Sequence, residues 1–166
     1  PETEPTLRKA LAIGADSAIR INMAALDGYS VALEISKIAK DGEYDLVIAG
    51  RESIDYNGGM VPGMIAALIG ASFINNCIGL EVEGSSCVGT REMDGGTETL
   101  STTFPLVIGS QKGLVEESDL KIPNMRGIMM ARQKQLDVFK AQNINSRAVD
   151  KRFFKPEEKG EVKLVS

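Results

Sequence analysis

The chain has 166 residues, 43% of them hydrophobic, which suits one sizeable globular domain. Acidic residues outnumber basic ones by 23 to 19 and give a net charge of −4, so no broad basic surface for nucleic acid is expected. Histidine is absent, which removes the commonest general base and disfavours a hydrolase triad.

The first part of the chain alternates helical and strand-like patterns. Apolar residues recur at helical spacing over residues 6–15, and residues 17–22 alternate like a short strand. A second helical stretch covers residues 29–40 after an Asp27-Gly28 turn. Its apolar face, which we expect to pack on a sheet, carries Val31, Ile35, Ile38 and Ala39, while Glu34, Lys37 and Lys40 share another face.

Residues 45–50 form a continuous apolar run that ends in glycine, a pattern typical of a parallel strand buried on both faces. A polar, glycine-bearing loop follows, and helical spacing returns over residues 60–68, with Pro62 in the first turn. Because helices and strands alternate, the sequence predicts an α/β sheet with crossover connections.

The pattern then changes to short strands. An Asp-Gly-Gly sequence at residues 94–96 is a strong hairpin signal. A basic, methionine-rich stretch follows, and residues 136–139 predict a last strand. Beyond residue 141 the chain is polar without a helical stripe, so we expect an extended arm. The other expected strands cover residues 77–83, 87–93, 97–103 and 105–109.

Two cysteines, Cys77 and Cys87, lie in this strand-like region with no histidine to join them, so neither a zinc site nor a disulfide is expected. No apolar run approaches the roughly 20 residues of a membrane-spanning helix. No signal peptide is visible. These features predict a cytoplasmic or matrix-type protein.

The loop after the apolar run 45–50 is the candidate ligand site. In open α/β sheets, ligands bind at the carboxyl ends of strands, and backbone N–H groups beside a helix N-terminus suit a phosphate. Ser53 and Asn57 can donate hydrogen bonds, and two glycines let the backbone approach a ligand. The alternative is an ordinary polar loop with a helix cap. The candidate residues are Gly50, Arg51, Glu52, Ser53, Ile54, Asp55, Tyr56, Asn57, Gly58, Gly59, Met60 and Val61.

Four segments, in this order and spacing, resemble the electron transfer flavoprotein beta family: DLVIAGRESID, REMDGGTETL, FPLVI and IPNMRGIMMARQK. The preceding ALAIGAD matches as well. The resemblance implies an adenine-nucleotide α-hydrolase-like (Rossmann-like) fold, with a mostly parallel sheet, a β-hairpin and an extended C-terminal arm. It divides the chain into a partial nucleotide-binding domain (1–140) and the arm (141–166). Because the family's first strand is missing, we interpret the chain, which starts at Pro1, as N-terminally truncated.

The resemblance implies an electron carrier and not an enzyme. Such a beta subunit pairs with an alpha subunit that holds most of an FAD, and carries electrons from dehydrogenases, such as acyl-CoA dehydrogenases, to an electron-transfer-flavoprotein:quinone oxidoreductase. The loop 50–61 would hold a structural AMP or, in a bifurcating relative, a second FAD. Two alternatives share the fold: an ATP-using enzyme, whose Ser-Gly-Gly loop and metal carboxylates are not found here, and a nucleotide sensor, which should lack the hairpin and the basic stretch.

The resemblance also implies two partner contacts. Glu92 is placed to pair with a basic residue of the alpha subunit's flavin domain, although hairpin charges also commonly face water. Residues 123–134 resemble the recognition loop for the dehydrogenase, with Met125 at an anchor position that is usually leucine. The alternative is an amphipathic helix with Ile128 and Met129 in the core. The candidate partner-binding residues are Glu92, Met125, Arg126, Ile128, Met129 and Arg132, and no metal-binding residue is predicted.

Overall fold

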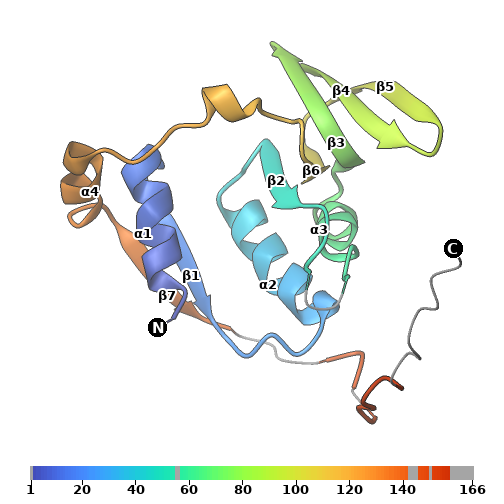
Figure 1. Cartoon of the computed structure of the whole chain (residues 1–166), viewed down its shortest axis with the longest axis horizontal. Coiled ribbons are helices and arrows are strands. Elements are labelled where there is room, and N and C mark those ends of the chain that lie inside the picture. The colour runs from blue at the N-terminus through green and yellow to red at the C-terminus, as the bar shows by residue number, and fades with distance from the viewer. Residues whose placement is uncertain (1, 55–56, 142–145, 150, 158–166) are drawn as a thin grey trace, which may run out of the picture.

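The structure is a computed structural model that describes residues 2–54, 57–141, 146–149 and 151–157 (Figure 1). The helices of this described part are α1 (Glu4–Ile13), α2 (Gly28–Asp41), α3 (Val61–Ile69) and α4 (Met125–Ala131), with a 3-10 turn at Glu117–Asp119. The strands are β1 (Ala18–Asn22), β2 (Leu46–Gly50), β3 (Ser72–Glu83), β4 (Ser86–Met93), β5 (Gly96–Thr103), β6 (Leu106–Ser110) and β7 (Leu136–Lys140). The predicted helices and strands are confirmed, and the largest difference is the earlier start of β3.

The helix ends follow from local sequence. The carboxylate of Asp27 accepts a hydrogen bond from the Ser30 backbone N–H, and the Ser30 hydroxyl accepts one from the Asp27 N–H, which is a capping box for α2. Pro62 stands in the first turn of α3, where its missing N–H costs nothing. Gly70 ends α3 in the left-handed conformation, at φ +72°, which glycine adopts without steric cost.

The main sheet has five strands in the order β2-β6-β3-β4-β5. β2, β6 and β3 are parallel, whereas β3-β4 and β4-β5 are antiparallel. β3 serves both parts: residues 72–74 pair with β6, a register shift follows, and the remainder pairs mainly with β4. The predicted α/β class and the β4-β5 hairpin are therefore confirmed.

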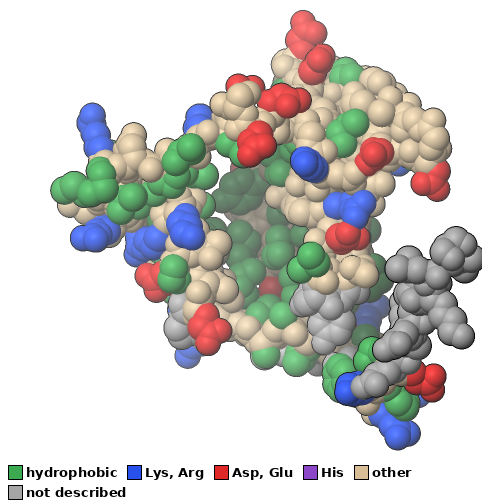
Figure 2. All heavy atoms as spheres, viewed as in Figure 1, with side chains coloured by type: hydrophobic (Ala, Val, Ile, Leu, Met, Phe, Trp, Pro, Cys, Tyr) green, Lys and Arg blue, Asp and Glu red, His purple; other side chains and the backbone are tan. Residues whose placement is uncertain are grey.

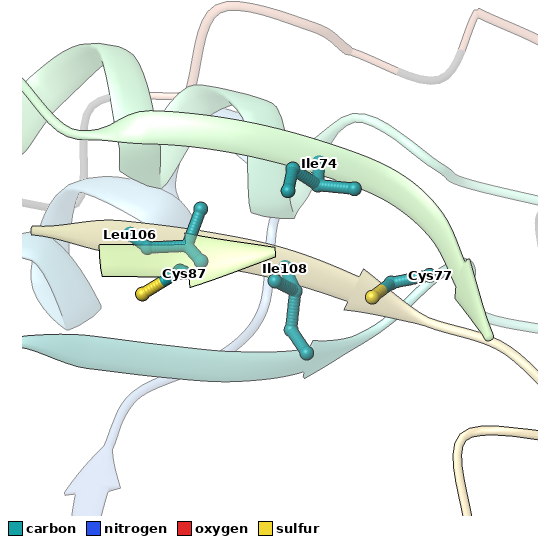
Figure 3. Packing of buried hydrophobic residues seen from close by; sticks show 5 residues of the cluster. All are labelled: Ile74, Cys77, Cys87, Leu106 and Ile108. Carbon is teal, nitrogen blue, oxygen red and sulfur yellow. The ribbon is translucent and has the colours of Figure 1, made fainter. Parts of the chain in front are cut away.

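β6 lies at the centre of the core. Leu106 and Ile108 point to one face of the sheet, where they pack with Ile74, Cys77 and Cys87 (Figure 3). Val107 points to the other face and packs against Ala32 of α2 and against Ile65 and Ala66 of α3. Complete burial of each such aliphatic side chain stabilises the fold by roughly 1.5–3 kcal/mol. Both cysteines are free thiols.

β1 and β7 form a separate, two-stranded parallel sheet. It is covered by α1 and α4 and has its own small core of Leu11, Ala18 and Ala131. A groove of about 330 Å³ lies between β1 and β2, and its lining includes Ile19 of β1 and Ile48 of β2. In Figure 2 an apolar hollow opens between the two parts of the molecule.

This groove explains two wrong predictions. β2 was expected to be buried on both faces, but it is an edge strand that pairs only with β6, and the Ile48 side chain is 58% exposed. In α2, the predicted apolar face is only partly buried, because Ile35 and Ile38 line the groove. The buried residues of α2 are Ser30, Ala32, Glu34, Ser36 and Ala39.

Glu34 is the most unexpected residue of that buried set. It shares a helix face with Lys37 and Lys40, apart from the predicted apolar face, but the residue is only 5% exposed. Its carboxylate forms an ion pair with the Lys37 ammonium group, one turn along the helix. A buried carboxylate requires such a partner, because burial removes its hydrating water and an ion pair compensates for the lost hydration.

Candidate functional site

The loop that follows β2 is closed on itself. The Ser53 N–H donates to the Gly58 carbonyl at 3.2 Å, and the Gly58 N–H donates back to the Ser53 carbonyl at 3.3 Å. At its start, the Arg51 N–H donates to the Ser110 carbonyl of β6 at 3.0 Å, so the loop is also tied to the central strand. Asn57 has a left-handed backbone, at φ +48°, which suits asparagine in a tight turn.

The same bonds show which backbone groups the loop leaves for a ligand. The N–H groups of Arg51, Ser53 and Gly58 are used within the protein. In the described part of the chain, the N–H groups of Gly59 and Met60 have no hydrogen-bond acceptor. Met60 is the N-cap of α3 and gives the helix no side-chain cap. A small anionic group therefore fits at the α3 N-terminus, where the helix dipole favours negative charge.

The other candidate residues of the loop differ in exposure and position. Ile54 is almost wholly exposed. The Arg51 guanidinium forms an ion pair with the adjacent Glu52 carboxylate. Asp55 and Tyr56 lie outside the described residues.

A polar chain of three side chains crosses the carboxyl edge of the parallel strands. The Arg51 Nη1 donates to the Gln111 Oε1 at 3.0 Å, and the Gln111 amide nitrogen donates to the Glu92 carboxylate. The Gln111 backbone N–H is held by the Cys77 carbonyl at 2.9 Å. The structure thus joins two of the predicted site residues, one from the ligand loop and one from the hairpin.

Gln111 was not among the predicted site residues. It directly follows β6, as Arg51 directly follows β2, and these two strands are parallel neighbours. Polar residues just after neighbouring parallel strands meet at one edge of the sheet. This signal is present in the sequence and could have identified Gln111.

α4 carries most of the other predicted contact residues. Asn124 caps the helix by accepting a hydrogen bond from the Gly127 N–H at 2.7 Å. Met125 is 75% exposed. The interpretation that placed Ile128 and Met129 in the core is wrong, because both are exposed and the small Ala131 is the helix's buried residue. Arg126, on the same short helix, and Arg132, which directly follows it as the C-cap, are both exposed.

α4 is held in place by basic side chains that reach across to helix carbonyls. The Arg8 Nη1 of α1 donates to the carbonyls of Ala131 at 2.8 Å and Lys134 at 2.9 Å. In return, the Lys134 Nζ donates to the carbonyls of Leu11 at 3.1 Å and Ala15 at 2.6 Å, near the end of α1. Cations at helix C-termini complement the helix dipole. Ile122, which precedes α4 and was not predicted, is 85% exposed and is the more prominent apolar side chain of this surface.

The predicted residues therefore form two groups and not one. Arg51 and Glu92 come together at the main sheet, whereas α4 lies against α1 on the separate two-stranded sheet. Figure 1 shows α4 and the β4-β5 hairpin at opposite sides of the molecule.

The described residues offer neither a reactive thiol nor a metal-binding cluster. Desolvation by burial raises the pKa of the Cys77 thiol, which leaves it protonated and poorly reactive at neutral pH. Among the described residues, no cluster of three or more His, Cys, Asp or Glu side chains could hold a metal ion. No helix in the described part of the chain is long and apolar enough to span a membrane.

The fold and the four sequence segments agree with comparisons to known proteins. The family model described as the electron transfer flavoprotein domain matches residues 1–143. The chain is 33% identical over 148 residues to the electron transfer flavoprotein subunit beta of Bacillus subtilis, covering 87% of this chain and 56% of that protein. It is 35% identical over 137 residues to the subunit beta of Mycobacterium tuberculosis, covering 80% and 50% of the two chains.

A eukaryotic relative gives the same result. The chain is 33% identical over 136 residues to the probable electron transfer flavoprotein subunit beta of Schizosaccharomyces pombe, covering 81% of this chain and 52% of that protein. The chain spans about half the length of the curated relatives that it matches. It belongs to the electron transfer flavoprotein family, and its similarity within that family is to the beta subunits.

Proposed function

We propose that this chain is part of a beta subunit that works beside an alpha subunit as an electron carrier, with no substrate chemistry of its own. The proposal is supported by the family and by one observation at the site: within the described residues, the N–H groups of Gly59 and Met60 have no acceptor, and they lie beside a helix N-terminus without a side-chain cap. We place the protein in the cytoplasm of a bacterium or the mitochondrial matrix of a eukaryote.

The ligand of the loop is an adenine nucleotide, and its phosphate sits at the start of α3. The N–H groups of Gly59 and Met60 bind the phosphate, and the dipole of α3 stabilises its charge. The side chains of Ser53 and Asn57 add hydrogen bonds. AMP is the first candidate because one phosphate suffices for this small site, and the diphosphate of a second FAD is the alternative.

Electron transfer itself belongs to the flavin that the alpha subunit mainly holds. FAD, when bound, accepts and donates the electrons. This chain contributes surfaces: Glu92 contacts the alpha subunit, and Met125 with its basic neighbours Arg126 and Arg132 docks a flavin dehydrogenase such as an acyl-CoA dehydrogenase. The electrons then pass to an electron-transfer-flavoprotein:quinone oxidoreductase.

Ligand release from the purified complex of the two subunits tests this proposal. Denaturation followed by mass spectrometry should yield FAD and AMP in a one-to-one ratio. Two moles of FAD without AMP would instead identify the bifurcating type.

A matched pair of variants tests the site. Met60→Pro deletes one N–H group at a backbone that proline tolerates, at φ −85°, and should remove the nucleotide, whereas Met60→Ala keeps the N–H and should retain it. Full nucleotide content in the Met60→Pro complex would move the binding site away from this loop.

A further inference from the structure

A buried oxygen near the carboxyl edge of the main sheet has no hydrogen-bond partner. It is the Oδ1 atom of the Asn75 side chain, and no donor in the described part of the chain reaches it. Such an atom has lost its hydrating water without gaining a protein partner, which is rare in folded proteins and calls for a specific reason. Asn75 lies in β3, where the register of this strand against β6 shifts.

The register of β3 places Asn75 on the face of the sheet that α3 covers. Ile74 packs with Ile108 on the opposite face (Figure 3). Because successive side chains of a strand alternate, Phe73 and Asn75 point toward α3. The Phe73 ring agrees with this direction, since a Cβ atom on Gly63 of α3 would lie 3.3 Å from it. Asn75 is therefore one step beyond Phe73 on the α3 face.

The N-terminus of α3 lies at the same edge of the sheet as Asn75. α3 follows the carboxyl end of β2 and ends at Ile69, shortly before Ser72. Ser72 pairs with Leu106, which is at the amino end of β6. The helix thus runs from the carboxyl edge of the parallel strands back to their amino edge, and its first turn is at the edge toward which β3 carries Asn75.

A glycine of β6 makes room for the Asn75 amide. A Cβ atom on Gly109 would lie 2.3 Å from the Asn75 Oδ1 atom, a distance that a real side chain cannot keep. The same Cβ atom would lie 3.6 Å from the Cα atom of Arg51, near the start of loop 50–61. Glycine at this position therefore allows the amide to lie across β6, close to the candidate ligand site.

We propose that Asn75 binds a ribose hydroxyl of the nucleotide whose phosphate lies at the start of α3. This assignment rests on the proposed function. Only a hydrogen-bond donor can pair with the Oδ1 atom, and a ribose hydroxyl is a donor, whereas the oxygens of an ionised phosphate are acceptors. The torsion that orients an asparagine amide is broad, so a small rotation turns this oxygen toward the sugar. Asn75 would thereby favour a nucleotide over a free phosphate ion.

Two variants of Asn75 and one control separate this role from a structural one. Leucine branches at the same carbon as asparagine, so Asn75→Leu removes the hydrogen-bonding group and keeps the shape of the side chain. Asn75→Ala is the second variant, which avoids overpacking against Gly109 if the leucine methyl groups prevent folding. Asn22→Leu is the matched control, because Asn22 is exposed at the end of β1, in the other sheet.

Calorimetric titration of the nucleotide-depleted two-subunit complex tests the assignment with three ligands: AMP, its dideoxy analogue, which lacks both ribose hydroxyls, and inorganic phosphate. Wild type and Asn22→Leu should bind AMP at least about 10-fold more tightly than the analogue. Asn75→Leu and Asn75→Ala should bind AMP at least about 10-fold more weakly than wild type does, and should no longer distinguish AMP from the analogue. Their affinities for the analogue and for phosphate should match those of wild type.

Two results would overturn the assignment. A preference for AMP over its analogue that persists in Asn75→Leu would mean that other residues bind the ribose. An equal loss of affinity for all three ligands would mean that Asn75 only supports the shape of the site. If the wild-type complex bound no AMP, the proposed nucleotide site would fail together with the role of Asn75, whereas AMP binding that is the same in wild type and in both variants would remove the role of Asn75 alone.

Discussion

The side-chain amide of Gln111 donates a hydrogen bond to the carboxylate of Glu92, 19 residues earlier in the chain. The other end of the same amide accepts from Arg51, so the hairpin carboxylate and the ligand loop share one intermediary. A substitution of Gln111 should therefore affect the positions of both Glu92 and Arg51, although neither residue is adjacent to it in sequence.

Gln111→Glu tests this link, because it replaces the donor to Glu92 with a second negative charge and keeps an acceptor for Arg51. We expect weaker binding of the alpha subunit, by about 1 kcal/mol, since repulsion turns the Glu92 carboxylate away from its position. Titration with the labelled alpha subunit at low and at high salt measures the binding affinity. The loss of affinity should be smaller at high salt, because salt screens the repulsion. Gln111→Met, which is uncharged and similar in size, is the control for charge. Equal affinities of Gln111→Glu and wild type at low salt would contradict the link.

Met125 should govern docking of the dehydrogenase. Truncation of an apolar anchor typically costs about 2 kcal/mol or more, so Met125→Ala should bind the dehydrogenase roughly 30-fold more weakly. Stopped-flow transfer from the reduced dehydrogenase to the flavin measures this, with flavin and nucleotide content unchanged. Ile122→Ala should behave similarly if both side chains form one anchor, whereas the exposed Val115 is a control on another surface. Unaltered transfer in Met125→Ala would remove the recognition-loop assignment.

Arg126 and Arg132 should act on the rate of encounter and not on the lifetime of the complex. Both guanidinium groups are exposed at the rim of α4, where charges steer association and contribute little once they are screened. Replacement of either by glutamine should lower the association rate constant about 2- to 5-fold at low ionic strength, and less above about 0.3 M salt. A changed dissociation rate with an unchanged association rate would place these residues inside the contact.

Two isoleucines of the main sheet should differ in their effect on stability. Ile108→Ala, in the central strand, should lower the free energy of unfolding by about 2–5 kcal/mol, because it opens a cavity in the core. Ile48→Ala, in the edge strand, should cost less than about 1 kcal/mol. Urea unfolding followed by circular dichroism compares them, and similar losses would show that β2 is covered in solution.

Asp27 predicts a pH dependence. Hydrogen bonds from Ser30, above all the one from its backbone N–H, hold the pKa of Asp27 well below its ordinary value. The backbone hydrogen bonds from Arg147 and Ala148 lower this pKa further. A carboxyl with a lowered folded-state pKa stabilises the protein above its unfolded pKa of about 3.9, and that contribution is lost as pH falls toward the folded-state value. Thermal unfolding from pH 6 to pH 2 should therefore fall more steeply for wild type than for Asp27→Asn. Parallel curves would contradict the lowered pKa.

The sequence predicted what local pattern controls and missed what depends on distant segments. The strand 45–50 was found, but its exposed Ile48 was not, because an apolar run does not reveal whether a neighbouring strand covers each edge. The buried face of α2 was missed, because α2 packs against α3 with a face that carries the small residues Ala32 and Ser36. Helical spacing shows which residues share a face of a helix. Which of these faces is buried depends on the neighbouring element, here α3, and the local sequence does not contain that information.

The site divides in the same way. The loop 50–61, the candidate ligand site, could be proposed from the sequence because one continuous segment supplies the strand end, the turn and the helix start. The hydrogen bonds from the Arg147 and Ala148 N–H groups to the Asp27 carboxylate could not be predicted, since these residues are about 120 positions apart and the arm has no periodic pattern. A short polar residue such as Asp27 is expected at a helix N-cap for local reasons. Its sequence context therefore did not indicate a second hydrogen-bond partner elsewhere in the chain.

The groove between β1 and β2 has a consequence for folding cooperativity. It leaves the core of Leu11, Ala18 and Ala131 apart from the clusters around β6. Cores that share few contacts open as separate cooperative units. The chain should therefore melt in two calorimetric transitions, the smaller one belonging to α1, β1, α4 and β7. A polypeptide segment that filled the groove would pair with both strand edges, join the cores, and merge the two transitions into one.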